Sequence, residues 1–341
     1  MNLQKAESIM EGTATVVKHT GSHYLLAQLP SWRLFPAVLR GKVRLGGSSA
    51  TNPVAVGDRV EFHTDGDLLP DGSVPASETA PAAITRILPR RNYIIRKSVN
   101  LSRQAHIIAA NVDHAFIVVT LAFPEVKLPF IDRLLVTCEV YGVKPVIVLN
   151  KIDIVDEFRD DFAPALENFH RIYEGAGYSI LEVSAKTGRG VDELRRLCLE
   201  KSEDGAPGIS LFSGVSGVGK SSLIKAMDPS LNPKTGLISE AHLQGRHTTT
   251  FYEMYPLCGG EGCIIDTPGI RGFGLVDLAP EEISLYFPEM LKVASDCRFT
   301  PCTHTHEPGC AVKAAVDDGT ISRERYASYL GMLEEYTKYR K

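Results

Sequence analysis

The sequence predicts a multidomain α/β chain with a small β barrel first, a parallel sheet with helices on both faces next, and a metal-binding helical domain last. Residues 13–97 contain five short segments rich in Val, Leu, Ile and Phe. From residue 111 such segments alternate with helical stretches, and three of seven cysteines fall within 297–310. A chain of 341 residues exceeds what one core usually organises. We expect domains at 1–97, 98–275 and 276–341.

The composition excludes several classes of protein. Apolar residues make up 44% and charged residues 23% of the chain, as in globular proteins rather than disordered or coiled-coil chains. The longest apolar runs are too short to cross a bilayer, and the N-terminal segment lacks an apolar signal core. We therefore expect a cytoplasmic protein that has no membrane partner.

Charge is distributed unevenly along the chain, whose net charge is −4. The first 100 residues carry 12 Lys and Arg against 8 Asp and Glu, whereas the rest carries 25 against 33. The N-terminal part is thus suited to a polyanion such as nucleic acid. A chance difference among solvated charges explains the numbers equally well.

The N-terminal segments predict a five-stranded barrel. The strands are expected at 13–18, 23–29, 35–45, 58–63 and 83–88, with turn residues between them. Five short strands in about 85 residues suit a small closed barrel, of which the oligonucleotide-binding barrel is the leading case. Another small barrel with no nucleic-acid role fits the same pattern.

The middle of the chain predicts a parallel sheet. Strands are expected at 112–121, 143–149, 178–183, 208–213 and 262–266. Helices are expected at 128–141, 156–176, 189–200 and 219–228. Near-continuous Val, Ile and Leu strands separated by helices are typical of a sheet covered on both faces. Ligands bind such sheets beyond the carboxyl ends of the strands, so the loops that follow the strands are the candidate site.

The loop after strand 208–213 predicts a phosphate site, because its sequence fits G-x-x-x-x-G-K-[ST]. Its candidate residues are Gly214, Val215, Ser216, Gly217, Val218, Gly219, Lys220, Ser221 and Ser222. Glycines let backbone N–H groups converge on phosphate oxygens, and the helix that follows presents its positive end. Lys220 is suited to the β- and γ-phosphates, and Ser221 to Mg²⁺.

Two other loops predict recognition of guanine. Asn150, Lys151 and Asp153 follow strand 143–149 in an N-K-x-D pattern. A carboxylate at Asp153 can accept from both N1–H and the exocyclic amine of guanine, a donor pair that adenine lacks. Ser184, Ala185 and Lys186 follow strand 178–183, where a backbone N–H can meet guanine O6. The tripeptide is weak evidence alone, but the loops together specify GTP.

The order of the loops indicates a circular permutation. Asp266 ends strand 262–266 and is suited to hold Mg²⁺, while Gly269 lets a backbone N–H approach the γ-phosphate. GTPases of the Ras type place the phosphate loop first and the base-reading loops last, whereas here the base-reading loops at 150 and 184 come first and the phosphate loop at 214 and Asp266 follow. A parallel sheet tolerates such a cut because chain termini often lie close together. The chain is therefore interpreted as a circularly permuted GTPase.

The segment 245–250 predicts a switch loop and a catalytic group. One of Thr248, Thr249 and Thr250 should close on Mg²⁺ and the γ-phosphate, and Thr249 is preferred. No glutamine follows Gly269 to orient the attacking water, so His247 is the best candidate for that role. A solvent-facing histidine on a polar loop is the alternative.

A cysteine cluster predicts a structural zinc site. Cys297, Cys302, His304 and Cys310 form C-x₄-C-x-H-x₅-C, and three thiolates with one imidazole suit tetrahedral Zn²⁺. His306 is a rival fourth ligand. The surrounding sequence has little apolar character, so a metal could replace a core there. A helix from Ser322 follows, with a packing surface at Tyr326, Tyr329, Leu330, Leu333 and Tyr336.

The barrel, the permuted loop order and the cysteine cluster together resemble the GTPases that depend on the small ribosomal subunit, the RsgA family of bacterial ribosome assembly factors. The resemblance covers nearly the whole chain. It implies GTP hydrolysis stimulated by the small subunit, a barrel that binds ribosomal RNA, a zinc domain and a role in late subunit maturation. The family pattern also favours His304 as zinc ligand and a histidine near residue 247 in catalysis.

The resulting hypothesis is a GTP hydrolase in which water attacks the γ-phosphate while Lys220 and Mg²⁺ offset the developing charge. Lys220 and His247 are its candidate catalytic residues. The expected partners are GTP or GDP and the small ribosomal subunit with its RNA, and the expected state is a monomer. The rival is an RNA-binding assembly module in which GTP is only a regulatory ligand, which the missing glutamine favours.

Overall fold

The computed structural model describes residues 9–20, 22–40, 54–65, 69, 72–97, 105–231, 252–266 and 278–339. The chain divides into two compact units. The first comprises Met1–Asp113, Arg196–Leu211 and Lys234–Pro268; the second comprises His114–Arg195, Phe212–Pro233 and Gly269–Lys341. Within the described ranges, no helix combines the length and the apolar character needed to cross a bilayer.

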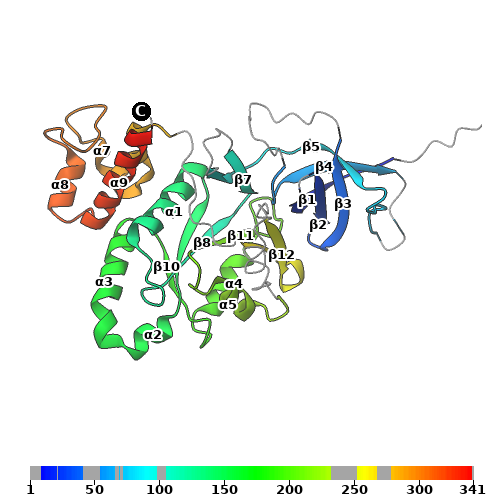
Figure 1. Cartoon of the computed structure of the whole chain (residues 1–341), viewed down its shortest axis with the longest axis horizontal. Coiled ribbons are helices and arrows are strands. Elements are labelled where there is room, and N and C mark those ends of the chain that lie inside the picture. The colour runs from blue at the N-terminus through cyan, green and yellow to red at the C-terminus, as the bar shows by residue number, and fades with distance from the viewer. Residues whose placement is uncertain are drawn as a thin grey trace, which may run out of the picture. The chain divides into compact units, whose positions relative to one another are not determined.

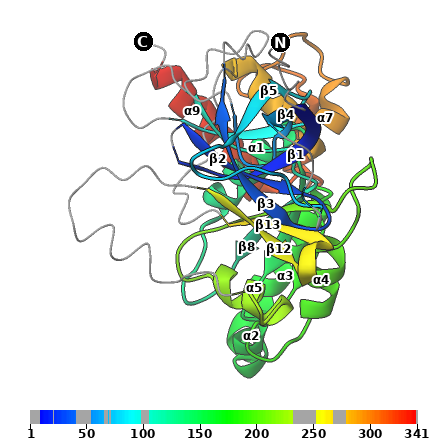
Figure 2. The ribbon, with the colours of Figure 1, turned by 90° about the vertical axis from the view of Figure 1, so that its right-hand side faces the viewer.

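The first unit begins with the predicted five-stranded barrel. Its strands are β1 (Ile9–Thr20), β2 (His23–Gln28), β3 (Arg33–Leu39), β4 (Arg59–Asp65) and β5 (Ala82–Ile87). β1 pairs with β2, β2 with β3, β3 with β5 and β5 with β4, and β4 returns to β1, so the sheet closes. These strands, blue to cyan in Figure 1 and Figure 2, curl round a common core. The prediction of a closed barrel is confirmed.

Alternating side chains fill the barrel. Val16, Leu26 and Ile84 are fully buried, and Phe35 packs on Phe62 with ring centroids 4.8 Å apart. Neighbouring strand residues face the other way, as the period of two requires. The apolar segments seen in the sequence are therefore the strands that close the core.

The first unit also contains strands that the sequence pattern did not indicate. β6 (Tyr93–Lys97) pairs with β7 (Ala105–Ala110) as a separate antiparallel ribbon. β12 (Glu253–Leu257) is also new, and it pairs antiparallel with β13 (Gly262–Asp266), the strand that was predicted at 262–266; η1 (Cys258–Gly260) joins the two. The residues of β12, EMYPL, include a proline and a glutamate and lack a continuous apolar run. Pairing with β13, rather than the intrinsic strand propensity of these residues, therefore gives β12 its extended conformation.

The second unit contains the parallel strands. β8 (His114–Val119) pairs parallel with β9 (Lys144–Leu149), which pairs parallel with β10 (Ile180–Glu182). The strand order is β10-β9-β8-β11, where β11 is Ile209–Ser213. Every residue of β8 is buried, as expected for a strand covered on both faces.

Helices follow these strands at the predicted places. They are α1 (Leu128–Tyr141), α2 (Ile152–Glu157), α3 (Arg159–Gly175), α4 (Val191–Cys198) and α5 (Lys220–Met227). α1 ends at Gly142, whose φ of 65° and N–H bonds to two carbonyls close the last turn. The single helix expected at 156–176 is instead two helices, because Phe158 has non-helical dihedral angles (φ −113°, ψ 46°).

The C-terminal part of the second unit has its own apolar core. It comprises η2 (Pro280–Tyr286), α7 (Pro288–Ala294), α8 (Ala311–Asp317) and α9 (Arg323–Tyr339). Ile283, Phe287, Met290 and Val312 are fully buried there, and Tyr329 of α9 packs among them. The expectation that metal replaces a core is therefore wrong: the region contains both a core and a candidate metal cluster, because isolated apolar residues of several short helices converge.

Candidate nucleotide and metal sites

The phosphate loop joins β11 to α5, and two of its glycines are required by close approach. Gly214 has φ 149°, and a Cβ there would lie 2.3 Å from the carbonyl oxygen of Val118. Gly219 has φ 97°, and a Cβ there would lie 2.4 Å from Nδ2 of Asn150. A side chain at either position would displace the loop from its neighbours. The glycines of the motif thus hold this loop against β8 and the N-K-x-D loop.

The accessible side of this loop is formed by small residues. Ser216, Gly217 and Ser222 are exposed, Val215, Gly219 and Ser221 are half-buried, and Val218 is buried. Val218 is the buried member of the loop, while its neighbours are at least partly accessible to solvent. An open backbone at the start of a helix is the arrangement that phosphate binding requires.

Lys220 is the first residue of α5, and its side chain is held inside the phosphate loop. Its Nζ donates to the carbonyl oxygens of Gly214, at 2.7 Å, and Val215, at 3.1 Å. The side chain is largely buried. A positive charge is therefore already positioned within the loop, where it can meet phosphate oxygens.

Asn150 connects the phosphate loop to both guanine loops. Its side chain is buried, Nδ2 donates to the carbonyl of Val218 at 2.7 Å, and Oδ1 accepts from the N–H of Ala185 at 3.3 Å. The amide N–H expected to meet guanine O6 thus has a long, weak bond to Asn150. In this arrangement Asn150 acts as a brace between loops that lie far apart in sequence.

Lys151 lies at the start of α2 in a left-handed conformation, with φ 63°. Its Nζ donates to the carbonyl of Gly217 at 2.8 Å and to the carbonyl of Phe123. The side chain therefore spans from the guanine loop to the phosphate loop. The contact with Phe123, in the loop after β8, was not anticipated from the sequence, since that loop carries no recognised motif.

Asp153 is oriented by the loop that contains Ser184. The Ser184 hydroxyl donates to Oδ1 of Asp153 at 2.6 Å and accepts from the N–H of Thr187 at 3.1 Å. Nζ of Lys186 lies 3.8 Å from Oδ2 of Asp153, whose side chain is 15% exposed. The Ser184 hydroxyl therefore orients the Asp153 carboxylate. Oδ2 has only the more distant Lys186 ammonium beside it, which suits a group that must accept from a base.

Asp266 is the last residue of β13 and is half-buried. It stands opposite Glu253 of β12 in the antiparallel register. The predicted switch and catalytic residues His247, Thr248, Thr249 and Thr250, and the γ-phosphate sensor Gly269, lie outside the described residues.

The cysteine cluster converges on one point. The ligand atoms of Cys297, Cys302, His304 and Cys310 all lie within 4.8 Å of one another. Sγ of Cys297 is 3.6 Å from Nδ1 of His304 and 3.9 Å from Sγ of Cys310, and that Nδ1 is 3.4 Å from Sγ of Cys310. A zinc tetrahedron has S···S edges of about 3.8 Å and S···N edges of about 3.5 Å, from bonds of about 2.3 and 2.0 Å. The donor set therefore fits Zn²⁺.

The environment distinguishes the two candidate histidines. His304 is buried, and burial lowers the pKa of its imidazole, which favours the neutral form that ligates metal. His306 is exposed, and its Nδ1 lies 2.9 Å from the Thr305 hydroxyl. His304 rather than His306 belongs to the cluster.

The loop that carries His304 is fixed on both sides. The hydroxyls of Tyr326 and Tyr329 donate to the carbonyls of His304 and Thr303, both at 2.6 Å. The predicted tyrosine stripe of α9 thus positions the ligand loop as well as packing. Glu307 accepts from the Thr303 hydroxyl and from two backbone N–H groups, and these bonds hold the pKa of its carboxyl far below the usual range.

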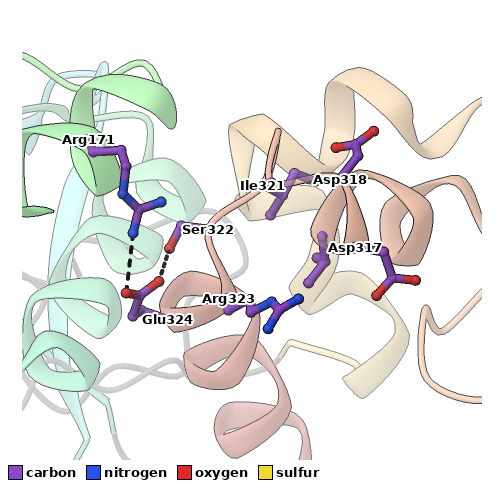
Figure 3. A pocket seen from close by; sticks show the side chains of 9 residues that line it. Arg171, Asp317, Asp318, Ile321, Ser322, Arg323 and Glu324 are labelled. Carbon is purple, nitrogen blue, oxygen red and sulfur yellow. Dashed lines mark hydrogen bonds and ion pairs between the residues drawn. The ribbon is translucent and has the colours of Figure 1, made fainter.

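A hollow lies apart from both sites, between α3 and the turn that joins α8 to α9 (Figure 3). Arg171 of α3 forms an exposed ion pair with Glu324 at 3.3 Å, and the Ser322 hydroxyl donates to the same carboxylate at 3.0 Å. Asp317 and Asp318 add negative charge to the lining. The mixed charges of the lining indicate no class of ligand. The ion pair of Arg171 with Glu324 joins α3 to the start of α9.

Comparison with known proteins identifies the family. A family model described as RsgA GTPase matches residues 87–276. A Flavobacterium johnsoniae protein named small ribosomal subunit biogenesis GTPase RsgA is 45% identical over 322 residues, which are 94% of this chain and 93% of that protein. A protein of the same name from Bacteroides fragilis is 46% identical over 327 residues, which are 95% and 98% of the two chains.

Solved structures agree. The crystal structure of YjeQ from Thermotoga maritima superposes with a TM-score of 0.71 at 33% identity, over 96% of this chain and 98% of that one. The crystal structure of YloQ, described as a circularly permuted GTPase, shares the fold with a TM-score of 0.67 at 24% identity, over 100% and 99%. The permuted order predicted from the loops is therefore confirmed at the level of the fold, and the chain belongs to the RsgA GTPase family.

Proposed function

We propose that this chain hydrolyses GTP to GDP and phosphate and acts in biogenesis of the small ribosomal subunit. The observation that carries the proposal is the brace made by Asn150, whose two amide atoms bond the phosphate loop and the loop of Ala185. This one side chain fixes the phosphate loop and the two base-reading loops relative to one another. One nucleotide can therefore contact all three loops. The named relatives supply the biological setting.

Selection of guanine rests on Asp153 in this proposal. The Ser184 hydroxyl orients the carboxylate, which then accepts from N1–H and the exocyclic amine of guanine. Adenine has no matching donor pair and would leave a desolvated carboxylate unsatisfied, which is costly. The Lys151 stem covers the base plane, and Ala185 or Lys186 offers an N–H to O6.

Phosphate chemistry rests on Lys220 and the loop amides. Lys220 exchanges its carbonyl partners for β- and γ-phosphate oxygens and offsets charge that develops as the γ-phosphoryl group leaves. Ser221, Thr249 and Asp266 would hold Mg²⁺, which supplies further charge neutralisation at the phosphates. His247 orients the attacking water, a role predicted from the sequence because Ile270, Arg271 and Gly272 replace the usual glutamine. The backbone N–H of Gly269 contacts the γ-phosphate, so its position depends on whether GTP or GDP is bound.

The remaining parts of the molecule contact the ribosome in this proposal. The closed barrel, in the basic first 100 residues, binds ribosomal RNA. Cys297, Cys302, His304 and Cys310 hold one structural Zn²⁺ that stabilises the C-terminal region. The protein works as a cytoplasmic monomer late in subunit maturation, and the subunit stimulates hydrolysis.

Phosphate release from GTP and from ATP, each with and without purified small ribosomal subunits, tests the proposal. GTP should be hydrolysed, ATP should not, and subunits should raise the GTP rate by at least tenfold, about 1.4 kcal/mol of barrier. Equal use of ATP and GTP would refute the base-reading assignment. Tight subunit binding without any stimulation would favour the alternative, an RNA-binding module in which GTP is only a regulatory ligand.

A further inference from the structure

The loop after β8 presents a bulky aromatic residue to solvent. Phe123 is 72% exposed, although it lies in a turn rather than on a surface helix. Its φ of 52° is in the left-handed region, which is strained for a residue of this size. The turn is held by the Thr120 hydroxyl, which donates to the Pro124 carbonyl, and by the Val126 N–H, which donates to Thr120 at 3.1 Å.

This loop touches both of the nucleotide-binding loops. The Phe123 carbonyl accepts from Nζ of Lys151, whose other partner is the Gly217 carbonyl at 2.8 Å. Cδ of Pro124 lies 3.5 Å from the position that a Cβ on Gly217 would occupy. Phe123 is therefore attached to the lysine of the guanine loop and adjoins the phosphate loop.

We propose that the ring of Phe123 packs against the bound guanosine and sets the affinity for guanine nucleotides. The inference rests on the proposed function, because it requires that Asp153 and Lys151 hold guanine. A base held by Asp153 lies along the stem of Lys151, two residues earlier, and the Nζ end of that stem is bonded to Phe123. Aromatic rings stack favourably on nucleobases, and nucleotide binding would bury the exposed ring.

The partner of Phe123 separates its effect from that of the catalytic groups. Lys220 is bonded within the phosphate loop, whereas the Phe123 carbonyl is bonded to Lys151 of the guanine loop. Loss of the ring should therefore weaken GDP and GTP equally and leave the turnover number of the saturated enzyme unchanged. The inference assigns an affinity residue, not a catalytic one.

Phe123→Asn tests this prediction, because asparagine removes the ring but tolerates the left-handed conformation. Affinities for fluorescent GDP and GTP analogues should both fall about tenfold, or about 1.4 kcal/mol, with kcat unchanged. The melting temperature of the nucleotide-free protein should not fall. The control is Phe158→Asn, at an exposed phenylalanine between α2 and α3, which should leave affinity unchanged. A lower melting temperature with unchanged affinity would make Phe123 merely structural and overturn the inference.

A second variant reports proximity directly. Trp32 is the chain's sole tryptophan, so Phe123→Trp in a Trp32→Phe background gives one fluorophore at the proposed contact. GDP should change its emission and ADP should not. Unchanged emission at saturating GDP would overturn the inference while the proposed function stands. Failure of the wild-type protein to bind any guanine nucleotide would instead refute both.

Discussion

Arg325 of α9 donates to Asp132 of α1 at 2.9 Å, and the two side chains are 0% and 1% exposed. Arg325 also donates to Glu289 of α7 at 2.7 and 3.0 Å, and its guanidinium lies 4.7 Å from the ring centroid of Phe287. One cation thus joins three helices of the second unit. Because α1 follows the loop of Phe123, this ion cluster connects the helices around the cysteine cluster to an element next to the candidate nucleotide site.

Arg325→Ala should destabilise the protein strongly, since it leaves two carboxylates buried without their cation. Breaking a buried pair typically costs about 3–5 kcal/mol. The matched control is Arg171→Ala, which breaks the exposed pair with Glu324 at a side chain 52% exposed and should cost under about 1 kcal/mol. Urea denaturation compares the two, and equal losses would argue against the structural role of the cluster.

Asp153→Asn should change base preference. An asparagine offers a donor where guanine N1–H and the exocyclic amine need acceptors, whereas xanthine presents an oxygen at C2. GTP affinity should fall about 10²-fold, because roughly two hydrogen bonds to a charged group are lost. The affinity for xanthosine triphosphate should rise. Competition binding measures the ratio. A preference for GTP that survives the substitution would remove Asp153 from base reading.

The metal cluster should lose zinc when one ligand is removed. Purified Cys302→Ser and His304→Ala proteins should contain far less than one zinc per chain and melt at lower temperature, because metal binding contributes to folding. His306→Ala, at the exposed neighbour, is the control and should retain the metal. Zinc should also be released as the pH falls, because protons compete for the thiolates. Elemental analysis that finds full zinc in His304→Ala would reject this ligand set.

Lys220→Ala and His247→Ala should affect different steps, the first nucleotide binding together with hydrolysis and the second hydrolysis alone. The first removes a phosphate contact, so nucleotide binding and hydrolysis should fall together. The second removes a group predicted to orient water, so GTP should bind normally while turnover falls about 10²-fold or more, with or without subunits. His242→Ala, five residues earlier in the chain, is the control. Normal stimulated turnover in His247→Ala would assign this histidine to the surface of a polar loop.

The chemistry of the site was predictable from short stretches of sequence. A phosphate loop needs glycines and Lys220 at fixed spacing, and guanine selection needs a carboxylate such as Asp153 after a buried strand. These requirements are local, so their residues are neighbours in the chain. The barrel was predictable because alternating apolar segments show which residues face a core, and the permutation was predictable because the motif loops occur in a shifted order along the chain.

Only the tertiary structure revealed which residues connect these parts. The long-range contacts of Asn150 with Val218, of Lys151 with Phe123, and of Arg325 with Asp132 span 68, 28 and 193 residues. Such pairs have no periodicity and no motif, because only folding brings their atoms together. The pairing of β12 and the core around Phe287 depend on neighbours in the same way. Sequence therefore determined the chemical groups of this GTPase, and tertiary packing determined which of them act together.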